Sequence, residues 1–128
     1  MTPRGLTFDD VARVGLELPG TEEATAYGGR CLKVNGRHFC GIAVNKSAEP
    51  NSLILHVSAA ERDVMIEEQP DLYYTAEHYE NYDCVLVRLS GLDRELLGDL
   101  LRLSHRFVAA KGPARRRTST TRKRKTRR

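Results

Sequence analysis

The sequence predicts an α+β fold built as two layers, with helices covering one face of an antiparallel sheet. Three observations predict it. Helical patterns occur near the start, the middle and the end of residues 1–110, and strand patterns occur in runs between them. No strand–helix–strand alternation recurs, as a parallel doubly wound sheet would require. The expected order is α-β-β-β-α-β-β-α in one domain, because about 110 residues support one core.

An opening helix is predicted from residue 7 to Pro19-Gly20, which would end it. Thr7 can cap the helix, and Asp10 lies at the third helical position, as in a capping box. Apolar residues follow near helical spacing, at Phe8, Val11, Ala12 and Leu18.

The segment CLKVNGRHFCGIAV predicts a hairpin, because Asn35-Gly36 is a preferred type I′ turn. With these two residues as the loop, the cross-strand pairs would be Val34–Arg37, Lys33–His38, Leu32–Phe39 and Cys31–Cys40. Leu32, Val34 and Phe39 would then face the core, and Cys31, Lys33, His38 and Cys40 would lie on the other face.

Opposed cysteines allow two interpretations. They could form a redox-labile disulfide or contribute ligands to a soft metal site. Alternatively they are two reduced thiols packed side by side, which we favour because the C-x₂-C spacing of a zinc knuckle is absent. We therefore expect no metal and no cofactor.

The remaining elements follow in order. SLILHV predicts a strand, and Ser58 with Glu61 forms a capping box that opens a helix ending before Pro70. LYYT and CVLVRLS predict two more strands. The last helix is expected from about Asp93 to Ala109, with a broad apolar stripe.

We call residues 1–110 the body and residues 111–128 the tail. The tail holds ten of the 21 basic residues and no acidic one, so the body keeps 11 basic residues against all 17 acidic ones, a net charge of −6. Because the tail lacks apolar surface, we expect it to be disordered. Its cations are Lys111, Arg115, Arg116, Arg117, Arg122, Lys123, Arg124, Lys125, Arg127 and Arg128.

Such a cluster of cations attracts any polyanion by releasing condensed counterions, and blocks of like charge are often nucleic-acid arms. The alternative is a solubilising terminus without a partner. A tail without aromatic residues has nothing to read base edges with, so binding through it would be independent of sequence.

A second candidate surface lies in LYYTAEHYENY, which contains Tyr73, Tyr74, His78, Tyr79 and Tyr82. These rings could stack on bases or line a pocket, or they could form a half-buried sheet edge, which we favour. The basic residues that could join this surface are Lys33, Arg37 and Arg88. The histidines His38, His56 and His105 occur singly and are interpreted as incidental.

Several functional classes are not supported. The chain has no G-x-S-x-G elbow, P-loop or dinucleotide fingerprint, so we expect a protein that is not an enzyme. No apolar run approaches about 20 residues, so we expect no membrane partner. An odd number of cysteines, three, and acidic residues near the start favour a reducing cytoplasm, where association with the nucleoid would be natural.

An ordered set of short motifs runs through most of residues 6–110. They are Leu18-Pro19-Gly20, Glu22-Glu23, Tyr27-Gly28, Lys33, Gly36, Phe39, His78-Tyr79 and Val87-Arg88-Leu89. In this order they resemble the MmcQ/YjbR-like family of small bacterial proteins. The chain departs from the family before the Val-Arg-Leu strand, where Asn81-Tyr82-Asp83-Cys84 replaces the usual Gly-x-Pro-Trp.

The resemblance implies a secretion-chaperone-like, YjbR-like two-layer fold, and a DNA-binding label based on a double-wing interpretation of the hairpins. Together with the tail, it leads us to expect an accessory protein that binds DNA or RNA, with a protein as a further potential partner. The alternative is a small protein- or ligand-binding module whose tail is incidental.

Overall fold

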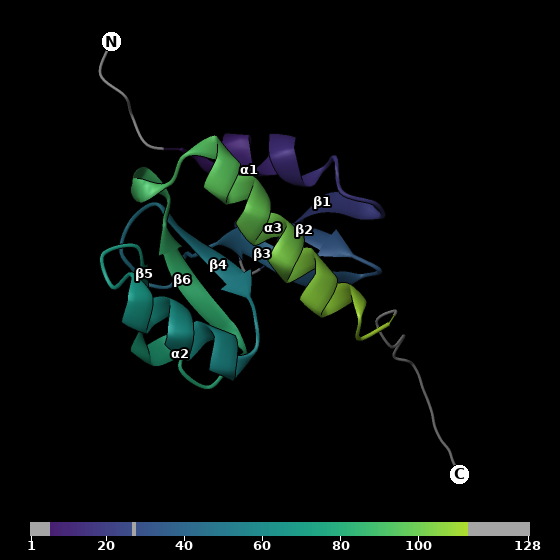
Figure 1. Cartoon of the computed structure of the whole chain (residues 1–128). Helices are drawn as coiled ribbons and strands as arrows, with labels where there is room; N and C mark the ends of the chain where they lie inside the picture. Colours follow the sequence, from purple (N-terminus) through teal and green to yellow (C-terminus); the bar gives the residue numbers. More distant parts are fainter. Residues whose placement is uncertain (1–5, 27, 113–128) are drawn as a thin grey trace.

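The computed structural model describes residues 6–26 and 28–112. Six antiparallel strands form one sheet in the order β1-β2-β3-β4-β6-β5, with three α-helices and two short 3₁₀ helices (Figure 1). The strands are β1 (Thr21–Ala26), β2 (Gly29–Val34), β3 (Arg37–Ile42), β4 (Ser52–His56), β5 (Tyr73–Tyr74) and β6 (Cys84–Arg88). The helices are α1 (Phe8–Gly15), α2 (Ala59–Glu68), η1 (Glu77–Tyr79), η2 (Leu89–Gly91) and α3 (Arg94–Ala109). The predicted α+β class is confirmed.

One face of the sheet is covered by helices. Figure 1 shows α3 crossing this face diagonally with α1 beside it, while α2 lies near β5 and β6. The core between the layers is built from fully buried side chains such as Val11, Leu32, Phe39 and Leu101, and Met65 of α2 packs into the same cluster. The two-layer arrangement expected from the sequence is therefore present.

The predicted order had five strands and lacked β1, whereas the structure has six strands in the described residues. The sequence of β1, TEEATA, has no alternation of apolar and polar residues and contains two adjacent glutamates. It forms a strand because it pairs with β2 along its whole length, from Thr21–Val34 to Ala26–Gly29. As an edge strand it has no neighbour on its other side, and the exposed charges of Glu22 and Glu23 discourage pairing with another chain.

The helix boundaries follow the predicted caps with one correction. The backbone N–H of Thr7 donates to Asp10 Oδ2 at 2.9 Å, and the N–H of Glu61 donates to Ser58 Oγ at 3.1 Å, as capping boxes and N-caps require. However, α1 ends at Gly15 and not at Pro19-Gly20. The chain then turns toward β1, which begins at Thr21.

The β2–β3 hairpin has the predicted turn but not the whole predicted register. Asn35 and Gly36 both have positive φ, 54° and 79°, and the pairs Val34–Arg37 and Lys33–His38 are confirmed. A β-bulge then shifts the ladder, so Leu32 pairs with Cys40 and Cys31 pairs with Gly41.

The predicted pairs Leu32–Phe39 and Cys31–Cys40 are therefore wrong. Packing explains the shift: the bulge adds Phe39 to one strand and buries its ring completely. It also brings a residue without a side chain opposite Cys31, where a Cβ on Gly41 would lie 3.0 Å from Cys31 Cβ.

Candidate functional site

The sheet face opposite α1 and α3 carries a hollow instead of a helix layer. Along β4, Leu53 and Leu55 belong to the core beneath the helices, whereas Ile54 packs with a separate cluster on the other face. Along β6, Val85 belongs to the core beneath the helices and Cys84 to the cluster on the other face, as the alternation of side chains in a strand requires.

We call the first part of this surface the aromatic hollow. It has a volume of about 350 Å³, and residues of β3, β4, η1 and β6 surround it. Its lining residues are His38, Ile54, His56, His78, Tyr79, Tyr82 and Cys84. This lining combines aromatic and apolar side chains, since it includes three histidines, two tyrosines and an isoleucine.

The basic hollow adjoins it and has a volume of about 360 Å³. Its lining residues are Gly36, Arg37, His38, His56, Val108 and Lys111. His38 and His56 line both hollows, so the two are neighbours across these rings. Among the described residues that line the basic hollow, none is acidic.

The basic hollow lies where the tail begins. Arg37 Nε donates to the backbone carbonyl of Gly112 at 3.0 Å, which holds the start of the tail against the hairpin. The ammonium group of Lys111 lies 4.7 Å from the centre of the Phe107 ring, at the end of α3. Cations of the hairpin and of the tail are therefore adjacent.

Four arginines of the body form local ion pairs. Arg30, Arg62, Arg94 and Arg102 each form an ion pair with a nearby aspartate or glutamate. At the hairpin tip and the end of α3, Arg37 and Lys111 line the same hollow.

The histidines shared by the two hollows are neutral at pH 7. Burial lowers the pKa of His56 from 6.5 to about 4, and the positive charges of His38 and Lys111 act in the same direction. Burial and the neighbouring Lys33 also lower the pKa of His38. Neutral imidazoles can donate and accept hydrogen bonds without adding charge.

The three cysteines are protonated thiols. Cys40 belongs to the core beneath the helices, so the prediction that its side chain lies on the other face of the sheet is wrong. Burial raises the pKa of Cys31, of Cys40 and of Cys84, the last to about 11. A thiol is a poor nucleophile, so these residues are not activated for covalent chemistry. Within residues 6–26 and 28–112, no three His, Cys, Asp or Glu side chains are arranged to hold a metal ion.

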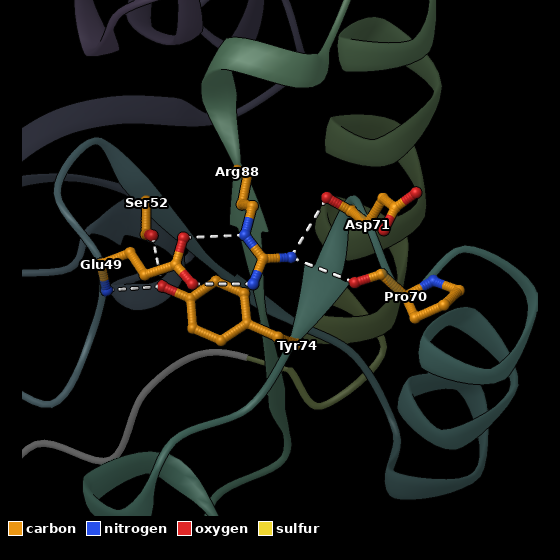
Figure 2. A network of polar contacts seen from close by, with 6 residues as sticks. All are labelled: Glu49, Ser52, Pro70, Asp71, Tyr74 and Arg88. Atoms are coloured by element: carbon orange, nitrogen blue, oxygen red, sulfur yellow. Dashed lines mark hydrogen bonds and ion pairs between the residues drawn. The ribbon is translucent and has the colours of Figure 1, made fainter.

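Arg88 and Tyr74, two predicted surface residues, belong to a structural network (Figure 2). The Arg88 guanidinium pairs with both carboxylate oxygens of Glu49 and donates to the carbonyls of Pro70 and Asp71, each at 3.1 Å. The Tyr74 ring lies 4.3 Å from the guanidinium carbon. Because Arg88 is already engaged by these partners, its role is to join three segments of the fold.

The tyrosines divide into core and surface. Tyr73 is 4% exposed in the main core and Tyr79 is 6% exposed beneath the aromatic hollow, so neither offers both ring faces to a ligand. The burial of these two rings favours their structural interpretation. Tyr82 is 56% exposed, and His78 beside it is also exposed.

Of the predicted basic residues, Lys33 lies on β2 next to His38, and Arg37 and Lys111 line the basic hollow. The other nine tail cations lie outside the described residues. They are Arg115, Arg116, Arg117, Arg122, Lys123, Arg124, Lys125, Arg127 and Arg128.

His38 and His56, interpreted from the sequence as incidental, both line the shared wall of the two hollows. Each occurs singly in the sequence, and only the pairing of β3 beside β4 brings them together. One signal was available: His56 lies two residues after Ile54 and so shares its face of the strand.

The sequence profile of the YjbR family matches residues 16–107. This chain belongs to the YjbR family.

A solved YjbR-family relative has the same fold. The crystal structure of Deinococcus radiodurans protein DR2400, a DUF419 domain, superposes with a TM-score of 0.69 at 29% identity. The match covers 88% of this chain and 85% of that one. The YjbR-like α+β fold implied by the resemblance thus agrees with a solved relative.

Sequence relatives of this YjbR-family chain include Uncharacterized protein Rv2570 of Mycobacterium tuberculosis and Uncharacterized protein Mb2600 of Mycobacterium bovis. Each is 30% identical over 108 residues, covering 74% of this chain and 82% of the relative. Their names state no activity, so the function of the YjbR-family chain must be argued from its own surface. Among the helices within the described residues, none is long and apolar enough to cross a membrane.

Proposed function

We propose that this YjbR-family protein binds nucleic acid, DNA in the first instance, without catalysing a reaction. The tail supplies contacts to phosphates that do not depend on sequence, and the basic hollow supplies a second contact on the folded body. The observation that carries the proposal is that the basic hollow lies at the start of the tail, where Arg37 donates a hydrogen bond to the carbonyl of Gly112.

The charge distribution supports this arrangement. The body has a net charge of −6, so a polyanion approaching most of its surface would be repelled. At the hairpin tip and the end of α3, Arg37 and Lys111 lie in the same hollow, and the sequence that follows Gly112 holds nine further cations. Nucleic acid is therefore expected at this end of the domain.

The test is fluorescence polarisation with a labelled DNA duplex. We would compare the full chain with a chain ending at Gly112 and with a full-length variant in which the tail cations after Gly112 are replaced by glutamine. Both changes should abolish most of the affinity at low salt. A full-length Arg37→Gln variant should cause a smaller loss. Unchanged affinity in the glutamine variant would contradict a binding role for the tail.

Salt dependence gives an independent measurement. If the tail neutralises about six to ten phosphates of a duplex, log K should fall against log salt concentration with a slope of roughly −5 to −9. A slope shallower than about −2 would mean that few tail cations contact the DNA, and the proposal would be wrong.

A second candidate function is a small-ligand or protein-binding module. The aromatic hollow favours it, since about 350 Å³ lined by rings and an isoleucine is within the size range of ligand sites. The two candidates differ in their dependence on charge, because a neutral ligand would bind equally well to the full chain and to the glutamine variant.

A further inference from the structure

We propose that the aromatic hollow receives an unpaired base, so that this protein prefers single-stranded nucleic acid to duplex. The inference rests on the proposed function, and names the form of nucleic acid that the same surface would take. The strand's phosphates would contact Arg37 and Lys111 in the basic hollow, while one base enters beside His78 and Tyr82.

The first argument is the adjacency of two different chemistries. The basic hollow offers cations to phosphates, and the aromatic hollow offers rings to a base. His38 and His56 form the wall common to both. Proteins that bind single strands combine these two features, a positive groove along the backbone with aromatic side chains for the bases.

The second argument is the ring geometry. Tyr82 is 56% exposed, and the centre of its ring lies 6.2 Å from that of His78, with an angle of 43° between the two planes. His78 is held in turn by an edge-to-face contact with buried Tyr79, with ring centres 4.8 Å apart. One supported ring and one exposed ring therefore stand at the mouth of the hollow.

The third argument is that the hollow suits a neutral, planar group. Its floor includes Ile54 and the protonated thiol of Cys84, neither of which would solvate a charge. His56 is neutral at pH 7 and can hydrogen-bond to the edge of a base. A phosphate would be poorly solvated here, whereas a base would bury its faces and keep a polar partner.

Duplex DNA cannot use this site. Its bases are stacked and paired, and taking one out costs the stacking and pairing energy. A single strand exposes its bases without that cost. The tail alone would bind either form, so a preference for single strands would have to arise from the body.

The experiment uses the full chain and three labelled probes of equal length: oligo-dT, the same oligonucleotide with abasic sites, and a duplex. Tyr82→Ala should weaken binding of oligo-dT about tenfold or more, since base–aromatic stacking supports a loss of this size. Binding of the abasic strand and of the duplex should change less than about twofold. Tyr82→Phe should retain most of the affinity because it keeps the ring.

A matched control is Leu16→Ala, which removes another exposed large side chain, 44% exposed, at the end of α1. It should leave all three affinities unchanged. His78→Ala provides a second variant at the hollow and should reproduce the selective loss for oligo-dT.

Three outcomes would overturn the inference. If Tyr82→Ala and His78→Ala leave oligo-dT binding unchanged while the tail variant still loses affinity, the base site is absent and the proposed function stands. If Tyr82→Ala weakens the abasic probe as much as oligo-dT, the ring does not contact a base. Failure of the unmodified chain to bind any probe would refute both the proposed function and this inference.

Discussion

Arg88 on β6 and Glu49 in the loop before β4 form a two-pronged ion pair, with Nη2–Oε2 and Nε–Oε1 distances of 2.7 and 2.8 Å (Figure 2). The same guanidinium donates to the carbonyls of Pro70 and Asp71, just after α2. One side chain thus ties the loop, the end of α2 and the edge of the sheet. The carboxylate hydrogen bond from Arg88 also lowers the pKa of Glu49.

Replacing Arg88 tests which of these contacts matters. We expect Arg88→Met to lower the free energy of unfolding by about 1 to 2 kcal/mol, because the carbonyls lose a charged donor and Tyr74 loses its cation. Glu49→Gln should have a much smaller effect, since an exposed ion pair contributes little. Urea denaturation measures both. An equal loss in the two variants would show that the ion pair dominates.

Two helical glycines should respond in opposite directions to alanine. A Cβ on Gly15 would overlap Leu32 Cδ1, and Leu32 is fully buried in the core. We expect Gly15→Ala to destabilise the protein by about 1 to 3 kcal/mol through overpacking between α1 and β2.

Gly98 in α3 provides the matched control. The nearest atoms to a Cβ there would belong to the guanidinium of Arg102, at 3.4 Å or more, and alanine is the better helix former. Gly98→Ala should therefore raise stability by about 0.5 to 1 kcal/mol. Thermal denaturation of both variants checks the pair, and a stabilising Gly15→Ala would contradict the close packing of α1 on β2.

The three cysteines should resist alkylation in the folded protein. Cys31, Cys40 and Cys84 are at most 4% exposed, and burial raises the pKa of each thiol. We expect iodoacetamide to label them slowly even at about pH 9 and rapidly after unfolding in urea. Peptide mass mapping identifies the modified sites. Fast native labelling of Cys31 or Cys40 would place them nearer the surface than the bulged register allows.

Acid should destabilise the fold partly through His56. Its pKa is about 4 in the folded protein against 6.5 without burial, so between these values the unfolded chain binds more protons. Stability is therefore fully present above about pH 6.5 and is lost as the pH falls toward 4. For a shift of this size the loss is about 2 to 3 kcal/mol by about pH 4.5.

His56→Gln isolates this contribution. Asp10 and Glu49 also have lowered pKa values, so their contributions to the stability of the protein are also lost in acid. Only the difference in acid loss between the unmodified protein and His56→Gln therefore reports on His56. Urea denaturation at about pH 7 and about pH 4.5 should show a smaller acid loss in the variant. Equal losses would mean that His56 is solvated in the folded state.

Local signals in the sequence were sufficient where a few neighbouring residues decide the structure. Asn35-Gly36 predicted its turn because both residues tolerate positive φ, and Ser58 predicted the start of α2 because its hydroxyl satisfies a free N–H. The apolar stripe predicted α3, and the separation of the cations of the tail from the acidic body is a property of the sequence itself.

What the tertiary structure decided were features that depend on distant partners. The segment TEEATA forms β1 because it pairs with β2 along its whole length. The register of the hairpin shifts by one residue at the bulge, because Phe39 fills the core and Gly41 makes room for Cys31. The hollow around His38 and His56 likewise has no local pattern. It arises because β3 pairs with β4, and such long-range pairing depends on packing that no short segment of sequence contains.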